Sequence, residues 1–570
     1  MYNMDDIAIT IAGEAGQGID TITDIIMKTF KSSGYNVFSS NEYMSRIRGG
    51  TNSSQIRISS SEVYSAVEKT DLLFALSQNS IDHAKNNLKN LKKETFILYD
   101  EALANLSLES YKSLAVPISS SAVKLGGKIF SNIISAGIIF GIFNLESNLI
   151  EENVRKNFSD KTGDIILKNI EAAKIGYEIG KNITALDKIT VAIQKDESVE
   201  EKILVNTTQS VALGCIAGGC DFISSYPMSP STGVLIYLSQ KSDDFNIIVE
   251  QAEDEICAMN MAIGAWSVGA RAMTSTSGGG FDLMSEGLSL AGIIESPMVV
   301  YLAQRPGPAT GFPTRTEQAD LNLALYSGHG EFPRIILTPG TNEDAFFLAR
   351  DAFNLADKYQ VPVFILTDQY LADAFSLCKS FELNNNDIQN FIVKTDLNYK
   401  RYKFTDDGIS PRGIAGFGEG FVKICSDEHE EDGDSTENFD VKEKMTEKRL
   451  KKYDLIKNEI YQPELFGSEK YKTLLIGWGS TCNAIKEAVK IINSPDLSFL
   501  YFKQVCPLPD IALSYLEKAQ KTICIENNAT GQFAGLIRRE LGFNVQNKIL
   551  KYNGLPFFVD ELVNKIKDLV

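Results

Sequence analysis

The sequence has few cysteines and histidines at metal-ligand spacing. This shortage excludes zinc proteins and iron–sulfur proteins. The 570 residues include three histidines and two tryptophans, and no two of the eight cysteines form a Cys-x-x-Cys pair. Without clustered cysteine or histidine, the chain has no ligand set of its own for zinc or an iron–sulfur cluster. We therefore expect no metal site, and we interpret the cysteines as small buried side chains in a reducing compartment.

Long apolar runs and an excess of positive charge are also missing. The most apolar stretch, 133–143, is too short to cross a bilayer, and the acidic start of the chain does not resemble a signal peptide. The net charge is −18, and seven acidic residues lie between Asp427 and Glu437. This charge disfavours nucleic acids and anionic membranes as partners. The sequence therefore predicts a cytoplasmic protein.

What the chain does contain is an alternation of apolar strand-like segments with helical ones. Hydrophobic residues make up 44% and charged residues 23% of the chain, which is ordinary for a globular protein, and the length suggests about four domains. The alternation predicts an α/β fold with parallel sheets, doubly wound in its second part. The predicted strands are 7–12, 35–38, 221–224, 245–249, 271–275, 298–303, 334–337, 361–366, 473–477, 497–502 and 522–526.

The pattern stops between residues 385 and 465. This stretch holds the acidic run and then the highly charged residues 442–452. We expect a long surface connection that is only partly ordered, with a helix over its charged part.

A glycine turn follows the first predicted strand. Gly13, Gly16 and Gly18 are spaced G-x-x-G-x-G, which differs from the G-x-G-x-x-G fingerprint of dinucleotide-binding proteins. The turn could hold a phosphate on its backbone N–H groups, or it could be a tight structural turn. The residues alone leave both interpretations open.

Two further segments carry polar groups next to predicted strands. Two prolines stiffen the loop Tyr226–Thr232 around Ser229, which either binds an anion or caps the next helix. The carboxylates Glu253, Asp254 and Glu255 begin a predicted helix of small residues. They either complement the helix dipole, or one of them is buried and exchanges a proton with a ligand nitrogen.

Two more segments follow the next strands along the chain. Gly278, Gly279 and Gly280 allow close backbone approach to a flat ligand that Phe281 would line, or they form a flexible loop. Arg305 is the first cation beyond the strand at 298–303, and a guanidinium there is suited to bidentate capture of a carboxylate. A lone arginine in a loop is otherwise a surface charge.

Taken together, these motifs resemble the fused γ–α subunit of the 2-oxoacid:ferredoxin oxidoreductases, most closely the 2-oxoglutarate (KorA-like) branch. The resemblance covers nearly the whole chain and rests on motifs that are weak singly but stand in the right order. It implies a γ-type α/β domain at 1–185, a thiamine-diphosphate pyrimidine-binding domain at 200–385, an acidic connecting segment at 386–465 and a transketolase C-terminal-like domain at 466–570. The matched motifs are Gly13–Gly18, Ser45–Thr51, Tyr226–Gln318, Lys403–Arg412, Ser426–His429, Gly477–Ser480 and Glu526–Gln532.

The resemblance also implies roles for individual residues. Glu255 matches the glutamate that hydrogen-bonds the aminopyrimidine of thiamine diphosphate and so promotes loss of the thiazolium C2 proton. Arg305 matches the arginine that binds the 2-oxoacid carboxylate, and Ser229 stands where the family often has threonine. Thr314 matches a position facing the distal part of the substrate, and Arg315 stands where lysine is common. Implied cofactor contacts also include Pro227, Gly278, Gly280 and Phe281.

What the chain lacks implies a partner. We find no Gly-Asp-Gly followed by the asparagine that holds Mg²⁺ and pyrophosphate in thiamine enzymes, and no cysteine set for a [4Fe–4S] cluster. In the family both lie on a β subunit, which implies an αβ or (αβ)₂ assembly, an interfacial active site and an inactive isolated chain. The implied reaction converts a 2-oxoacid, CoA and oxidised ferredoxin into acyl-CoA, CO₂ and reduced ferredoxin.

Other functions fit the residues less well. Pyruvate or branched-chain 2-oxoacids remain open as substrates, and so does a non-catalytic thiamine-fold binding subunit, although such a subunit would have no reason to keep Glu255. A nicotinamide-linked dehydrogenase would rest on the Gly13 turn alone. A serine hydrolase is disfavoured because no G-x-S-x-G segment is present.

Overall fold

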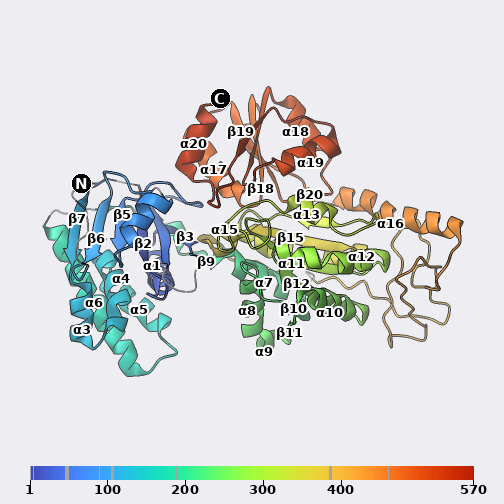
Figure 1. Ribbon diagram of the computed structural model, residues 1–570, viewed down its shortest axis with the longest axis horizontal. Helices are drawn as coiled ribbons and strands as arrows, with labels where there is room; N and C mark the ends of the chain where they lie inside the picture. Colours follow the sequence, from blue (N-terminus) through green and yellow to red (C-terminus); the bar gives the residue numbers. More distant parts are fainter. Residues whose placement is uncertain are drawn as a thin grey trace. The chain divides into compact units, whose positions relative to one another are not determined.

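The computed structural model describes residues 2–570 except 4, 45–49, 89, 104–107, 109, 187–190, 384–387 and 460. The chain forms two compact units, and the predicted α/β class is confirmed in both (Figure 1). The division into four domains stays a prediction. Unit 1 comprises Met1–Val205, Ala374–Ser380 and Phe558–Asn564, and unit 2 comprises Asn206–Asp373, Phe381–Phe557 and Lys565–Val570.

The sheet of unit 1 is mixed, not wholly parallel as predicted. Its strand order is β7-β6-β5-β2-β4-β3-β16-β9, and β4 runs antiparallel to both β2 and β3. Only eight residues separate β3 from β4, too few for the crossover that a parallel pair needs, so the two form a hairpin. The strands are β2 (Asp6–Glu14), β3 (Asn36–Glu42), β4 (Thr51–Ser59), β5 (Leu72–Ala75), β6 (Phe96–Asp100), β7 (Lys112–Val116), β9 (Lys202–Asn206) and β16 (Phe375–Lys379), and β1 (Tyr2–Asn3) pairs with β8 (Val191–Ala192).

The apolar stretch 133–143 is a buried helix of this unit. Gly137 of α4 and Gly176 of α6 lie so close to the opposite backbone that an added Cβ would meet a carbonyl oxygen at 2.4 and 2.1 Å. The apolar run is thus explained by helix-on-helix packing, and no helix in the described part of the chain is long and apolar enough to span a membrane. The helices of unit 1 are α1 (Ile19–Ser32), α2 (Ser80–Asp82), α3 (Ile118–Leu125), α4 (Ser131–Ile142), α5 (Ser147–Asn157) and α6 (Gly163–Ala185).

Unit 2 contains a seven-stranded, almost wholly parallel sheet at its centre. Its order is β11-β10-β12-β13-β15-β14-β20, and only β20 runs antiparallel. All six strands predicted for this region are found. They are β10 (Phe222–Ser225), β11 (Ile248–Gln251), β12 (Ala272–Thr276), β13 (Met298–Gln304), β14 (Ile335–Leu337) and β15 (Pro362–Asp368), and β20 (Gln504–Cys506) completes the sheet.

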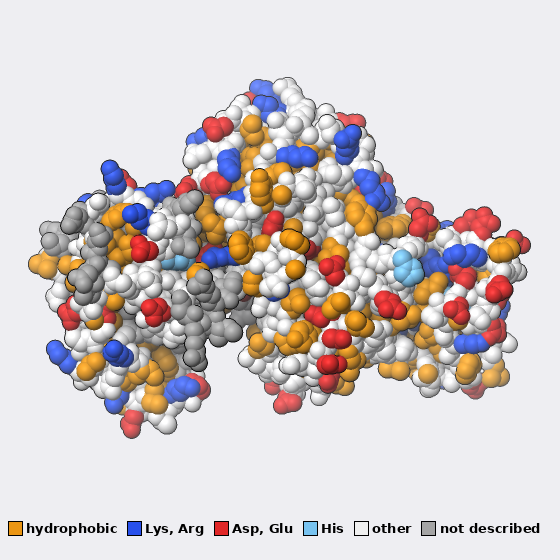
Figure 2. Space-filling model, in the orientation of Figure 1, with side chains coloured by type: hydrophobic (Ala, Val, Ile, Leu, Met, Phe, Trp, Pro, Cys, Tyr) orange, Lys and Arg blue, Asp and Glu red, His pale blue; other side chains and the backbone are white. Residues whose placement is uncertain are grey.

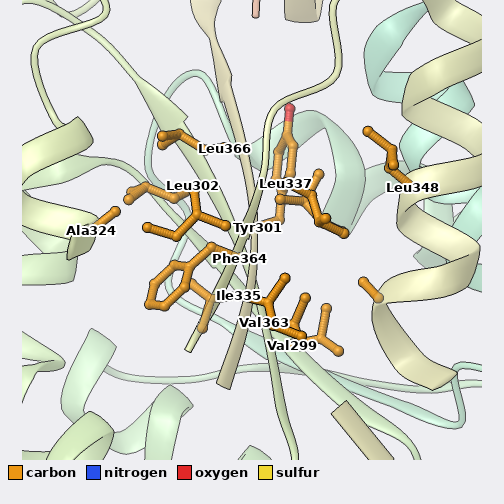
Figure 3. Packing of buried hydrophobic residues seen from close by; sticks show 14 of the residues in the cluster. Val299, Tyr301, Leu302, Ala324, Ile335, Leu337, Leu348, Val363, Phe364 and Leu366 are labelled. Atoms are coloured by element: carbon orange, nitrogen blue, oxygen red, sulfur yellow. The ribbon is translucent and has the colours of Figure 1, made fainter. Parts of the chain in front are cut away.

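Helices cover this sheet and close its core. Figure 3 shows Tyr301 of β13 and Leu337 of β14 on the same side of the sheet as Leu348 from α14, whereas Phe364 of β15 lies on the other side, toward Ala324. These side chains are fully or almost fully buried, so the strand edges are held rigidly. The helices are α7 (Thr207–Ala217), α8 (Thr232–Gln240), α9 (Ser242–Phe245), α10 (Glu255–Ser267), α11 (Gly278–Leu283), α12 (Ser285–Ile293), α13 (Leu321–Tyr326), α14 (Asn342–Tyr359) and α15 (Gln369–Asp373).

A second sheet of unit 2 has the order β17-β19-β18-β21-β22. Strand β20 of the same part of the chain pairs with β14, which ties this region to the seven-stranded sheet. Its strands are β17 (Glu464–Gly467), β18 (Thr473–Trp478), β19 (Leu497–Phe502), β21 (Lys521–Glu526) and β22 (Asn547–Leu550). Helices α17 (Thr481–Ile492), α18 (Ala512–Lys518) and α19 (Gln532–Leu541) lie between these strands in the chain, and most of α20 (Val559–Lys567) belongs to unit 1.

The expectation of a partly ordered connecting segment is wrong for its described residues. Helix α16 (Phe439–Glu459) extends beyond the predicted 442–452, and Arg412 forms an ion pair with Asp357 at 2.5 Å, both side chains being almost fully buried. Figure 2 shows acidic and basic side chains interspersed over this region, at the right of the view. Charge composition alone therefore misled the prediction, because several of these charges are paired inside the fold.

A second buried group of charges surrounds Glu295. Its carboxylate contacts Lys448 at 2.5 Å and Lys452 at 2.7 Å, and Arg401 donates to its backbone oxygen at 2.8 Å. Burial alone would raise the pKa of Glu295, but Lys452, Lys448 and Arg401 outweigh it and hold the pKa below its usual value. Through these contacts Lys448 and Lys452 hold α16 against the loop that follows α12.

Replacing Glu295 by glutamine should destabilise the chain by about 3–5 kcal/mol, because two buried ammonium groups lose their counter-charge. Urea unfolding of the wild type and the variant measures the difference. The matched control is Asp496→Asn, which breaks an exposed pair with Lys472 and should cost about 1 kcal/mol or less. Equal effects of the two substitutions would contradict a structural role for the cluster.

Candidate functional site

The candidate residues of unit 2 follow four neighbouring parallel strands. Strands β11, β10, β12 and β13 are adjacent in that order, and their carboxyl ends lie at one edge of the sheet. Ser229 follows β10, Glu255 follows β11, Gly278 follows β12 and Arg305 follows β13. Open α/β sheets bind ligands at this edge, so the fold gathers residues that are far apart in the sequence.

Glu255 begins helix α10 as a buried carboxylate. Asp254 caps the helix by accepting from the Cys257 N–H at 2.7 Å, so Glu255 is not needed as a cap. Glu255 is only 4% exposed, and its Oε1 has no hydrogen-bond partner in the described part of the chain. A buried carboxylate oxygen without a partner is costly, which favours the interpretation that it awaits a ligand.

The glycine segment, Gly278–Gly280, is shaped by carboxylates on both sides. A Cβ on Gly280 would lie 2.5 Å from Glu255 Oε1, and a Cβ on Gly278 would lie 2.5 Å from Asp320 Oδ2. Glycine is therefore required here for space. Phe281 is fully buried and packs edge-on against Phe364, with ring centroids 5.3 Å apart, so its ring supports the segment from the core. Its contact with a ligand stays a prediction.

Ser229 and Arg305 are brought into direct contact. Arg305 Nη1 donates to the Ser229 backbone oxygen at 2.8 Å. Ser231, not Ser229, occupies the N-cap position of α8, so the alternative of Ser229 as a helix cap is wrong. The Ser229 side chain is exposed, and Pro227 is half-buried in the same loop.

Arg305 also begins the 305–320 loop, which carries two other predicted residues. Thr314 and Arg315 are half-buried, and a Cβ on Gly554 would lie 3.3 Å from Arg315. Burial lowers the pKa of both arginines. For Arg305 the nearby charge of Asp320 partly offsets this by raising the pKa. Both guanidiniums are thus partly desolvated, which strengthens their attraction for an anion.

The second sheet of unit 2 fixes this loop through residues whose roles sequence reasoning missed. Gln318 donates from its side chain to the Trp478 oxygen at 2.9 Å, and its backbone N–H donates to the Asn527 oxygen at 2.7 Å. Asn528 donates to the Gln318 oxygen at 3.1 Å, and Gln532 donates to the Ala319 oxygen at 2.7 Å. The Glu526–Gln532 motif marks this segment in the sequence, but the motif does not predict its contacts with the 305–320 loop.

Asp320 was also missed. Burial raises the pKa of Asp320 to about 7, and Asp282 and Glu317 add to the rise while Arg305 opposes it. No local pattern in the sequence distinguishes this aspartate from a surface residue, because its burial depends on Gly278 across the site.

The Gly13–Gly18 turn lies in unit 1. The Glu14 N–H donates to Gln17 Oε1 at 2.7 Å, and Gly16 and Gly18 have φ of 91° and 69°, so the turn itself requires glycine. It also borders a cavity of about 600 Å³, lined among others by Asp100, Ser119 and Asn132. Ligand binding there stays open. The matched residues Ser45–Gly49 lie outside the described residues, and Thr51 begins β4.

Among the described residues no three His, Cys, Asp or Glu side chains gather as a metal site. Six cysteines are buried, and Cys257 and Cys425 are half-buried.

Helix α10 and the neighbouring strand β11 carry a group of exposed apolar side chains. Helix α10 presents Ile256 and Met261 to solvent, and the edge strand β11 presents Ile248, which is 64% exposed. Figure 2 shows hydrophobic and acidic side chains side by side over the part of unit 2 where Figure 1 draws α8 to α11. Exposed apolar residues in such a group are typical of a protein interface.

The fold and the site define an α/β protein with a ligand site at a sheet edge. Two family models match: "Pyruvate ferredoxin/flavodoxin oxidoreductase" over residues 8–179, and "Pyruvate flavodoxin/ferredoxin oxidoreductase, thiamine diP-bdg" over residues 213–448. The chain is 31% identical to a 2-oxoacid:ferredoxin oxidoreductase subunit alpha of Sulfolobus sp., over 98% of this chain and 96% of that one. It therefore belongs to the α subunits of the 2-oxoacid:ferredoxin oxidoreductases.

Two further relatives bear on the branch of the family. The 2-oxoglutarate oxidoreductase subunit KorA of Mycobacterium tuberculosis is 26% identical over 98% of this chain and 91% of its own length. The solved 2-oxoglutarate:ferredoxin oxidoreductase of Magnetococcus marinus, with 2-oxoglutarate, coenzyme A and succinyl-CoA bound, matches with a TM-score of 0.91 and 30% identity, over 99% of this chain and 100% of that one.

Proposed function

We propose that the chain is the α subunit of an enzyme that oxidatively decarboxylates a 2-oxoacid, favouring 2-oxoglutarate, with CoA and ferredoxin as co-substrates. The observation that carries the proposal is the unpartnered Oε1 of buried Glu255, which lies against Gly280 at the sheet edge that also holds Arg305. The names of the relatives and the substrate in the Magnetococcus marinus structure support the choice of 2-oxoglutarate.

The residues present fit the aminopyrimidine half of thiamine diphosphate. Glu255 offers a buried carboxylate to a ring nitrogen. In the glycine segment Gly279 is exposed, whereas a larger residue at Gly278 or Gly280 would collide with Asp320 or Glu255. When bound, thiamine diphosphate supplies a carbon nucleophile and an electron sink for decarboxylation. Glu255 would hold the proton at the ring nitrogen, and Pro227 would help shape the loop beside it.

Arg305 would bind the carboxylate of the 2-oxoacid. Its guanidinium is oriented by the Ser229 oxygen, which leaves other N–H groups for a carboxylate in bidentate geometry. The Ser229 hydroxyl is exposed next to it. Further along the loop, Thr314 and Arg315 would face the distal end of the substrate, where a second carboxylate of 2-oxoglutarate would favour a cation.

A β subunit would supply the other half of the site. We propose that it carries the Mg²⁺–pyrophosphate site and the [4Fe–4S] cluster, and that it covers the apolar surface around Ile248, Ile256 and Met261. The assembly would be αβ or (αβ)₂ and would work in the cytoplasm. The isolated chain would be inactive.

The test is to co-purify the chain with its genomic partner and assay 2-oxoglutarate, pyruvate and a branched-chain 2-oxoacid with CoA and a viologen dye. We expect dye reduction that needs both subunits and is highest with 2-oxoglutarate. Activity with none of the three acids would contradict the proposal, and a preference for pyruvate would correct its substrate.

Gly280→Ala should reduce turnover of the complex about tenfold, because the new methyl group must displace the Glu255 carboxylate or Thr276. The matched control is Gly264→Ala in the same helix as Glu255, where an added Cβ meets nothing within 4 Å. That control should keep full activity and bind thiamine diphosphate normally. If calorimetry shows the same cofactor affinity and the assay the same turnover for both variants, the glycine segment does not shape the site.

A further inference from the structure

Oδ2 of the Asp320 carboxyl group lies close to the glycine segment in the part of the chain that the structure describes. Oδ2 is shielded from solvent without a hydrogen bond, and no ion pair of Asp320 is found within the described ranges. The Asp320 N–H donates to Gln304 Oε1 at 2.9 Å, and Gln304 immediately precedes Arg305. This hydrogen bond joins the two ends of the 305–320 loop. It places the Asp320 carboxyl group near the strand end that carries Arg305.

Asp320 and Glu255 flank the same glycine segment. Asp320 Oδ2 lies against Gly278 and Glu255 Oε1 lies against Gly280, and both oxygens lack partners in the part of the chain that the structure describes. Arg305 donates to the Ser229 oxygen and forms no ion pair with Asp320, although the charge of each affects the other. The Gln304 contact therefore brings Asp320 to the strand end that carries Arg305, without an ion pair between the two side chains.

The charges around Asp320 favour its acid form. Burial raises its pKa most, Asp282 and Glu317 raise it further, and Arg305 acts against them, so the pKa is about 7. Glu255 is a further carboxyl group across the glycine segment. An approaching anion would stabilise the neutral acid still more. At neutral pH the group can therefore donate a hydrogen bond beside a bound carboxylate.

We propose that Asp320 contacts the 2-oxoacid in its acid form, donating a hydrogen bond to the substrate beside Arg305. This inference rests on the proposed function and deepens it, because it makes substrate binding depend on a proton. Below its pKa the acid form is present and binding is strongest. Above it the carboxylate repels the substrate anion, so binding weakens and each bound substrate takes up a proton.

A competing role predicts the opposite sign. In this role Asp320 would be a carboxylate that faces the positive charge of the cofactor and would donate no hydrogen bond to the substrate. Its deprotonation would then remove no donor, and substrate binding would not weaken for that reason. Thiamine diphosphate affinity would then fall in the asparagine variant, and the substrate affinity would stay level or rise with pH.

The experiment uses the complete complex and 2-hydroxyglutarate, which keeps both carboxylates but is not a 2-oxoacid. Its inhibition constant is measured against 2-oxoglutarate from pH 6 to 9. In the wild type we expect the constant to rise above about pH 7, approaching tenfold per pH unit. Calorimetry in two buffers of different ionisation enthalpy should show proton uptake on binding at pH 7.5.

Variants separate this role from a structural one. Asp320→Asn keeps a neutral donor, so its inhibition constant should stay within about threefold from pH 6 to 9. Glu317→Gln, the matched control, removes a neighbouring carboxyl group, so the rise should persist but begin at lower pH. A structural role would lower stability or kcat in Asp320→Asn without removing the pH dependence.

Two results would overturn the proposal: a wild-type inhibition constant that does not rise above pH 7, or an Asp320→Asn complex that keeps the wild-type rise. Absence of proton uptake by the wild type would do the same even if the variant did not fold. Failure of the proposed function is distinguishable, because then no 2-oxoacid is turned over at any pH.

Discussion

Glu255→Gln should lower turnover of the assembled complex by about 10²-fold or more, the scale of a positioned proton transfer. Glutamine keeps the size of the side chain but cannot hold and release a proton at the ring nitrogen. Because Glu255 is buried and Asp254 already caps α10, the substitution should leave the helix intact. Steady-state assays with 2-oxoglutarate, together with an unfolding curve, measure both effects.

The matched control is Glu253→Gln, two residues earlier in the same acidic run. Glu253 is exposed, so its substitution should leave turnover unchanged. Near-wild-type turnover of Glu255→Gln would remove Glu255 from the mechanism. Equal losses in both variants would attribute the effect to the charge of the segment.

Arg305→Lys should weaken apparent affinity for the 2-oxoacid by about 1.5–3 kcal/mol, the range of a charged hydrogen bond. Lysine keeps the charge, but it lacks the planar fork that can bond the Ser229 oxygen and a carboxylate together. The loss should therefore fall mainly on KM. The full kinetic profile with 2-oxoglutarate separates KM from kcat.

Arg155→Lys serves as the control, because Arg155 pairs with Glu151 on the exposed face of α5. It should leave both constants unchanged. If Arg305→Lys had the kinetics of the wild type, the substrate carboxylate would have to bind elsewhere.

The parallel core of unit 2 could be predicted from the sequence, whereas other parts of the fold could not. Strands such as β13 and β15 are continuous apolar runs because both faces are buried, and such runs are visible in one sequence. Strand β4 is rich in serine and was missed, although eight of its nine residues are buried. The connecting segment was misjudged because its charges pair with residues far along the chain, such as Arg412 with Asp357.

The residues of the candidate site can likewise be separated into those that the sequence predicts and those that it does not. The order of the strands and the rule for sheet edges could place Glu255 and Arg305 at one edge, but their roles came from family resemblance. Asp320 and Gln318 depend on contacts across the fold, with Gly278 and with Asn527 respectively. The sequence has no local signal for such contacts. The packing of the Phe281 ring against Phe364 is likewise a contact across the fold.

The most direct test of the account follows the C2 proton of thiamine diphosphate by hydrogen–deuterium exchange, without any substrate. We expect fast exchange only when this chain and its β partner are mixed, and exchange slowed by about 10²-fold or more in a mixture carrying Glu255→Gln. Equally fast exchange in the Glu255→Gln mixture, or in the β subunit alone, would contradict the claim that this chain supplies the activating carboxylate.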